Sequence, residues 1–116
     1  SEKGLCKVIC FSPDHSLTIP QMERSAIENV IRVWQDEYVK IGAMDGINYV
    51  QIFENKGAVM GCSNPHPHGQ IWSNRSLPNE PAKEQEAQLE YYEKNRSSLL
   101  GDYLKQELAS GERIVI

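Results

Sequence analysis

The sequence has little of several things that would point to a particular class of protein. It has only three cysteines, too few for the disulfide framework of a small secreted domain. No apolar run approaches the ~18 residues that a membrane-spanning helix needs. Basic residues are not in excess, because 12 Lys and Arg stand against 16 Asp and Glu for a net charge of −4. The sequence therefore predicts a cytoplasmic protein with neither nucleic acid nor a membrane as a partner.

Two of the three cysteines fall in one short segment. Cys6 and Cys10 are four residues apart in a stretch that reads as a strand, so they share a face but lie too far apart to form a disulfide. We expect both to be small core residues. Cys62 lies in a glycine-containing loop.

The composition and length describe one globular domain. The chain of 116 residues is 40% hydrophobic and 24% charged, which is typical of a folded protein with its own core. We therefore predict a single domain over residues 1–116. Residues 1–4 begin abruptly before a strand and residues 114–116 end within one, which favours a fragment of a longer chain.

Apolar spacing and turn residues predict strands that alternate with long helices. Strands are expected over residues 5–12, 47–54, 65–74 and 112–116, and helices over residues 23–41 and from Pro81 to Gly111, with a possible break at 97–98 or at Gly101. We expect the strands to pair in the order in which they occur, with the helices against the sheet, which is an α+β fold. Trp34 continues a helical apolar stripe and is predicted to be core.

The densest signal lies between residues 61 and 72, which contain two of the three histidines. In an extended strand, His66, His68, Gln70 and Trp72 share one face. Pro67 has no N–H for a strand ladder, so the segment must be an edge, a strand start or a bulge. Trp72 either lines a site on this face or only packs there.

Four segments carry a resemblance to a known family. They are VICFSPDH at residues 8–15, FENKG at 53–57, GCSNPHPHGQ at 61–70 and LPNE at 77–80. The chain resembles the galactose-1-phosphate uridylyltransferase family, in the transferase branch of the histidine-triad superfamily. The resemblance runs over essentially all of the chain but covers only the middle third of the family's length. It implies a histidine-triad-like fold, an antiparallel half-barrel sheet with flanking helices.

His68 is the candidate nucleophile. A neutral imidazole can attack phosphorus, and the product is labile enough to react again. The resemblance implies that His68 takes UMP from UDP-glucose and passes it to galactose 1-phosphate. The amide of Gln70 can donate to a phosphoryl oxygen without acting as an acid or base. Hydrolytic members of the superfamily carry a third histidine where this chain has Gln70, which favours a transferase.

The resemblance also implies contacts to the nucleotide. It places Asn55, Gly61, Cys62 and Ser63, together with Gln70, at the substrate. From the residues alone, the loop of residues 57–64 is a weaker candidate whose backbone N–H groups would face phosphates.

Metal ligands are implied in the same way. The resemblance predicts that His15 and His66 share a zinc ion with two cysteines upstream, and that Glu84 binds a second metal, iron or zinc. Zinc normally takes four ligands, and this chain offers two. Without the resemblance, His15 is a turn residue in solvent and Glu84 is a solvated charge near a helix start.

Two other readings stay open at this point. One is another histidine-triad nucleotidyltransferase or a phosphorylase, such as one that acts on dinucleoside polyphosphates. The other is a non-catalytic module that binds a nucleotide or a metal. The resemblance itself implies a homodimer in the full-length form.

Overall fold

The structure is a computed structural model that describes residues 2–62 and 64–115. In chain order its elements are β1 (Gly4–Cys10), the short 3₁₀ turn η1 (Ile19–Gln21), α1 (Arg24–Gly42), β2 (Tyr49–Phe53), the 3₁₀ turn η2 (Ala58–Met60), β3 (His68–Asn74), α2 (Asn79–Asn95) and α3 (Leu99–Ser110). The chain divides into two compact units, Ser1–Leu77 and Pro78–Ile116. Each unit is described by itself, and one domain over residues 1–116 stays a prediction.

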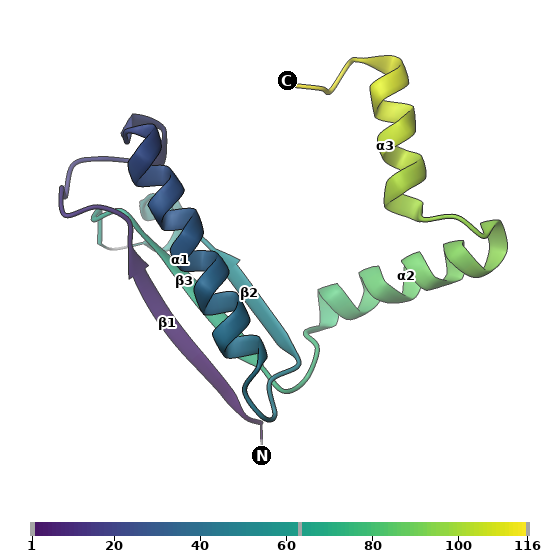
Figure 1. Cartoon of the computed structure of the whole chain (residues 1–116), viewed down its shortest axis with the longest axis horizontal. Coiled ribbons are helices and arrows are strands. Elements are labelled where there is room, and N and C mark those ends of the chain that lie inside the picture. Colours follow the sequence, from purple (N-terminus) through teal and green to yellow (C-terminus); the bar gives the residue numbers. More distant parts are fainter. Residues whose placement is uncertain (1, 63, 116) are drawn as a thin grey trace. The chain divides into compact units, whose positions relative to one another are not determined.

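The first unit is an open antiparallel sheet of three strands with α1 across one face (Figure 1). The strand order is β1-β3-β2. Strand β3 pairs with β1 from Gly4↔Asn74 to Cys10↔His68, and with β2 from Tyr49↔Asn74 to Phe53↔Gln70. The expected α+β class is therefore confirmed.

Pairing in chain order, however, is wrong. Strands β1 and β2 both run antiparallel to β3, so they are parallel to each other and cannot be joined by a tight turn. Helix α1 forms the crossover between them. Strand β3 comes later in the chain and lies between β1 and β2. The central strand of the sheet is thus the histidine strand itself.

The core lies between the sheet and α1. Phe11, Met22 and Val30 form a buried cluster, and Trp34 packs against it with its ring edge-on to Phe11 at 5.7 Å between centroids. The prediction that Trp34 is a core residue is confirmed. Ile71 of β3 is fully buried, as is Ile41 near the end of α1.

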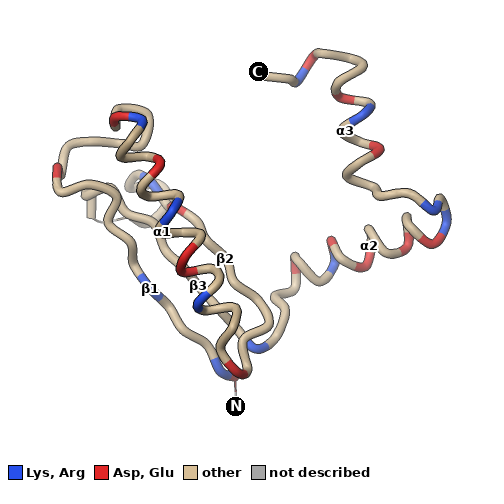
Figure 2. The backbone as a smooth tube through the Cα atoms, in the orientation of Figure 1, with Lys and Arg blue, Asp and Glu red and all other residues tan. Residues whose placement is uncertain are grey.

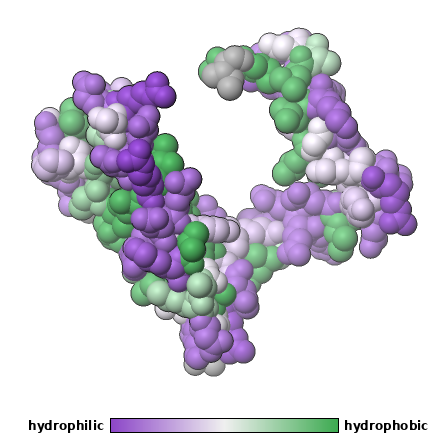
Figure 3. Space-filling model, viewed as in Figure 1, coloured by the Kyte–Doolittle hydropathy of each residue, from purple (hydrophilic) through white to green (hydrophobic). Residues whose placement is uncertain are grey.

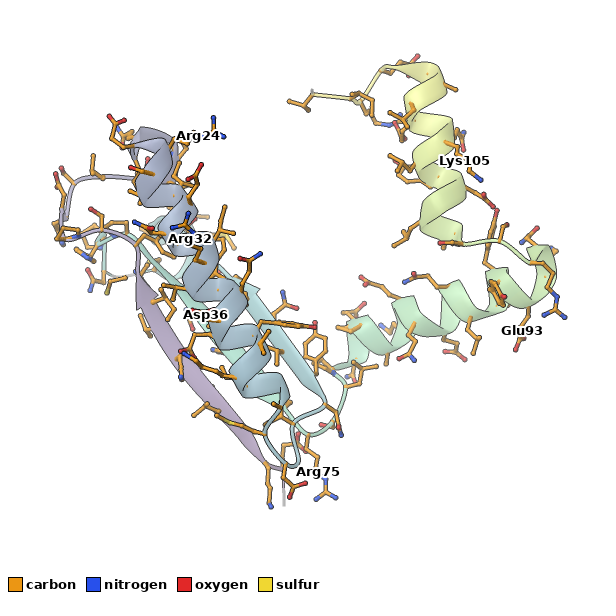
Figure 4. The ribbon with its side chains drawn as sticks, viewed as in Figure 1. Arg24, Arg32, Asp36, Arg75, Glu93 and Lys105 are labelled. Atoms are coloured by element: carbon orange, nitrogen blue, oxygen red, sulfur yellow. The ribbon has the colours of Figure 1, made fainter. Side chains whose placement is uncertain are left out.

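The outer surface of α1 carries charged side chains of both signs together with exposed Ile31, Val33 and Val39. Lys and Arg alternate with Asp and Glu along it (Figure 2), and Arg24, Arg32 and Asp36 are exposed (Figure 4). Across the described residues, no helix has both the length and the apolar character to span a membrane.

The expectation that Cys6 and Cys10 are core residues is wrong. Both side chains are exposed, because the alternation along β1 turns Leu5 and Ile9 toward the helix side and the cysteines toward the open side. A strand over residues 112–116 is also not found, as 112–115 are irregular and Ile116 lies outside the described residues. Arg113 there bends back to form a 2.6 Å ion pair with the buried Glu107.

The second unit consists of α2 and α3. The predicted break at 97–98 is the correct alternative, because Arg96 adopts a left-handed conformation at φ 57° and Ser98 caps α3 by accepting from Gly101 N at 3.2 Å. Leu100, Leu104 and Leu108 on α3 are exposed within this unit, and hydrophobic surface is visible along the helix in Figure 3.

Candidate active site

A cavity of about 630 Å³ opens at one end of the sheet in the first unit. Three segments line it: residues 15–18 of the turn after β1, residues 54–58 after β2, and residues 62 and 64–68 before β3. These segments are distant in the sequence. They meet because β1 and β2 end on either side of the start of β3.

His68 is the first residue of β3 and is half-buried at the cavity wall. Its Nδ1 lies 2.6 Å from the backbone oxygen of His66. A carbonyl oxygen can only accept, so Nδ1 must carry the proton and donate. In the neutral ring, this leaves the lone pair on the other nitrogen, Nε2, which is the form that a nucleophile requires.

His66 does not lie on the strand face that the sequence predicted, because β3 begins two residues later. Pro67 directly precedes the strand, and its carbonyl accepts from Phe11 N at 2.9 Å. Of the three alternatives for a proline here, the strand start is therefore correct. The side chain of His66 instead turns toward the turn after β1.

There it meets His15, 51 residues earlier in the chain. The two Nδ1 atoms are 3.1 Å apart, and the rings are tilted by 38°. The turn that carries His15 is held by Asp14, whose carboxylate accepts from Ser16 N at 2.9 Å and Ser16 Oγ at 2.7 Å. These hydrogen bonds, with a smaller contribution from the charges of His15 and His66, lower the pKa of Asp14.

The donor set of this pair suits half of a zinc site. Two nitrogens bound to one tetrahedral zinc ion at roughly 2.0–2.1 Å would be about 3.3–3.4 Å apart, close to the separation found here. Among the described residues, however, no group of three or more His, Cys, Asp or Glu side chains could hold a metal ion. Glu84 lies in α2 of the second unit, and the described residues around it likewise form no group of three metal-binding side chains.

Gln70 occupies the next position after His68 on the open face of β3, but it is not among the residues that line the cavity. Its Oε1 accepts a hydrogen bond from Trp72 Nε1 at 3.1 Å. Trp72 in turn packs edge-on against Phe53, with ring centroids 5.5 Å apart. Trp72 therefore does not line the cavity and contacts its neighbours on the sheet.

The four other residues predicted at the nucleotide have different positions. Asn55 and Cys62 line the cavity. Gly61 is not part of the lining, and its φ of 73° ends the η2 turn in a conformation that favours glycine. Ser63 lies outside the described residues.

Lys56 is a site residue to which the sequence analysis assigned no role. It is the one Lys or Arg among the residues that line the cavity, and it forms no ion pair with any residue that the structure describes. A lysine in a cavity that His68 also lines is suited to binding phosphate, and Glu54 is the one carboxylate among the same lining residues. The sequence feature that could have identified Lys56 is its position directly after Asn55 in the FENKG segment.

The first unit is an α+β fold whose open antiparallel sheet has a histidine at the start of its central strand. The chain belongs to the galactose-1-phosphate uridyl transferase family. Residues 1–78 match the N-terminal domain of that family.

Named relatives agree with this assignment. A galactose-1-phosphate uridylyltransferase from Haemophilus influenzae is 57% identical over 98% of this chain and 32% of its own length. The enzyme of the same name from Schizosaccharomyces pombe is 50% identical over 98% of this chain and 32% of its own length. The chain thus spans about a third of the length of these relatives.

Solved structures share the fold. A uridylyltransferase structure superposes with a TM-score of 0.86 at 25% identity, over 90% of this chain and 34% of that one. An ADP-glucose phosphorylase from Arabidopsis thaliana with bound ADP-glucose has a TM-score of 0.77 at 26% identity, over 81% of this chain and 30% of that one.

Proposed function

We propose that this chain supplies the nucleophile of a galactose-1-phosphate uridylyltransferase, an enzyme of galactose metabolism, as part of a whole protein of its relatives' length. The whole protein would move UMP from UDP-glucose to galactose 1-phosphate. The observation that carries the proposal is the 2.6 Å hydrogen bond between His68 Nδ1 and the His66 carbonyl, at the wall of a cavity large enough for a phosphoryl group.

The chemistry takes place in two displacements at one phosphorus atom. In the first, His68 Nε2 attacks the α-phosphorus of UDP-glucose, a P–N bond forms, and the bond to the bridging oxygen breaks to release glucose 1-phosphate. In the second, a phosphate oxygen of galactose 1-phosphate attacks the same phosphorus, the P–N bond breaks, and UDP-galactose leaves. The proton on Nδ1 stays in place through both steps, and the His66 carbonyl stabilises the charge that the ring carries in between.

Gln70 would act on the phosphoryl oxygens. Its NH₂ group can donate to a non-bridging oxygen as negative charge develops there, and it has no titratable proton to pass to a leaving group. Asn55, Gly61, Cys62 and Ser63 would contact the nucleotide. Gln70 in place of a third histidine favours transfer to a second sugar phosphate over hydrolysis.

Zinc is the implied cofactor at the first metal site. His15 and His66 would hold it with two ligands from elsewhere in the whole protein, and it would brace the segment whose carbonyl orients His68. At Glu84 we propose a second metal, iron or zinc. Zinc analysis after dialysis should give well under one ion per chain for residues 1–116, because two ligands bind weakly. A stoichiometric zinc that resists chelators would contradict this ligand assignment.

The remaining parts of the proposal concern the whole protein. We infer that it is a cytoplasmic homodimer whose partners are UDP-glucose and galactose 1-phosphate. The catalytic residues proposed on this chain do not by themselves select a sugar.

The test is a covalent adduct. The whole protein is incubated with UDP-glucose as sole substrate, quenched and mapped by tandem mass spectrometry. We expect one added UMP on His68, and its loss on addition of galactose 1-phosphate with formation of UDP-galactose. UMP on any other residue, or no adduct at all, would contradict the mechanism.

A phosphorylase is the second candidate, favoured by the likeness to the ADP-glucose phosphorylase. Both enzymes would form a nucleotidyl-histidine, but they would differ in nucleotide and acceptor. The same experiment with ADP-glucose, followed by inorganic phosphate, separates them. Formation of ADP in place of UDP-galactose would support the phosphorylase.

A further inference from the structure

We propose that Trp72 is a positioning residue for the transfer, because its indole N–H sets the orientation of the Gln70 amide. The inference rests on the proposed function, in which Gln70 donates to a phosphoryl oxygen. Its basis is the 3.1 Å hydrogen bond from Trp72 Nε1 to Gln70 Oε1 on the open face of β3.

The direction of this hydrogen bond follows from the chemistry of the two groups. An indole nitrogen is only a donor, whereas a glutamine amide has an accepting oxygen at one end and a donating NH₂ at the other. Only the oxygen can face Trp72, so the NH₂ group must point away from it. An inverted amide would place oxygen lone pairs where a phosphoryl oxygen accumulates negative charge.

Trp72 is itself held by the sheet. Its ring packs edge-on against Phe53 at an interplanar angle of 82°, and Phe53 is the residue of β2 directly opposite Gln70. Trp72, Phe53 and Gln70 therefore form a small cluster on two paired strands. Trp72 is 51% exposed, so it lies outside the core that α1 covers.

The informative variant is Trp72→Phe in the whole protein. It removes the indole N–H and keeps an aromatic ring beside Phe53. Because one neutral hydrogen bond is lost, we expect the rate of His68 uridylylation at saturating UDP-glucose to fall by between about 2-fold and 10-fold. The KM for UDP-glucose should change little, since Gln70 acts on charge that develops during the reaction.

Trp34→Phe is the matched control. It makes the same chemical change in the core, where Trp34 Nε1 has no hydrogen-bond partner among the described residues. The folded Trp34→Phe protein should react at the parent rate. A loss equal to that of Trp72→Phe would overturn the inference, because it would then reflect a general effect on the sheet.

A double-mutant cycle separates positioning from packing. In a Gln70→Ala background, Trp72→Phe should have no further effect on the rate, because there is no amide left to orient. Full additivity of the two losses would overturn the inference. As a spectroscopic readout, the indole N–H resonance of Trp72 should shift on Gln70→Ala, while that of Trp34 should stay in place.

Failure of this inference can be told from failure of the proposed function. If the parent protein forms no UMP adduct on His68, the proposed function is wrong and so is the role of Trp72. If the parent forms the adduct and Trp72→Phe forms it at the parent rate, only the role of Trp72 is overturned.

Discussion

The two faces of strand β3 share one backbone but have different contacts. The positions on the α1 side, Gly69, Ile71 and Ser73, are all buried, whereas His68 and Gln70 on the other side are half-buried and Trp72 is half-exposed. Because side chains alternate along a strand, every second residue is committed to packing and the others are free for chemistry. Substitutions on the α1 side should therefore mainly lower stability, whereas substitutions on the open side should mainly lower activity.

The covered face tolerates little change in volume. A Cβ added to Gly69 would lie 2.7 Å from Phe11 Cζ and 3.1 Å from the Phe53 carbonyl oxygen. Ser73 Oγ donates to the Leu5 carbonyl at 2.9 Å and accepts from Leu5 N at 3.2 Å. This close packing pins the register of β3, and the register determines which residues reach the open face.

The largest effect is expected on the open face, at His68. His68→Ala should abolish the UMP adduct, because no other side chain in strand β3 can attack phosphorus. Its free energy of unfolding should stay within about 1 kcal/mol of the parent, since the side chain is outside the core. Intact-mass measurement checks the loss of the adduct, and urea unfolding checks the free energy of unfolding. A normal adduct in this variant would contradict the assignment of His68 as the nucleophile.

Gln70→Ala should come next. Removing one preorganised donor typically costs on the order of 10²–10³ in rate, so both half-reactions should slow while His68 still becomes uridylylated. Rapid-quench kinetics of each half-reaction measure the loss. Gln70→His should in addition release more UMP to water than the parent does. If a loss of stability accounted for the lower rate, Gln70 would be a packing residue and its proposed role in the transfer would be wrong.

Ile71→Ala should have the opposite profile. The side chain is fully buried, so its truncation should lower the free energy of unfolding by about 2–5 kcal/mol. The protein that remains folded should form the adduct at the parent rate. Val8→Ala on the open face of β1, where Val8 is 63% exposed, should cost less than about 0.5 kcal/mol. An equal cost at Val8 would mean that the open face is covered in the whole protein.

Lys56→Met tests the charge of the cavity. We expect the KM for UDP-glucose to rise on the order of 10-fold, because a charged contact to phosphate is lost, with partial recovery in Lys56→Arg. Lys83→Met in the second unit is the control, since Lys83 pairs only with Glu80 among the described residues. Steady-state kinetics at two salt concentrations should show a weaker salt dependence for Lys56→Met. An unchanged KM would exclude Lys56 from phosphate binding.

The smallest effect is a pH dependence on the covered side. Lys7 Nζ donates to Glu37 on α1 at 2.5 Å, and this contact lowers the pKa of Glu37 below its usual 4.5. A lowered pKa in the folded state means that the pair stabilises the fold above pH 4.5 and that this contribution is lost as the pH falls through the lowered value. Urea unfolding of the parent and of Lys7→Met from pH 7 to pH 3 should show a difference that shrinks below pH 4.5. A constant difference would contradict the assignment.

Local sequence signals predicted the elements of this chain well. The apolar spacing from residue 23 to residue 41 predicts α1 to within one residue at each end, and the paired serines at 97–98 mark the break between α2 and α3. Both signals act within a few residues of chain, as helix spacing and capping do. The resemblance to the family at residues 61–70 likewise depends on a short stretch of sequence.

What the sequence by itself determined is therefore the position of α1, the three strand segments of the sheet to within three residues at each end, and the chemistry of the side chains at residues 66–72, although it also predicted a strand over 112–116 that is not found. Only the tertiary structure decided which face those side chains occupy and what they contact. The exposure of Cys6 and Cys10, the meeting of His15 with His66, and the bond between Trp72 and Gln70 all depend on β3 lying between β1 and β2 with α1 on one side. An alternating strand can present either face to a helix, so its pattern alone does not say which face is covered until the strand order is known.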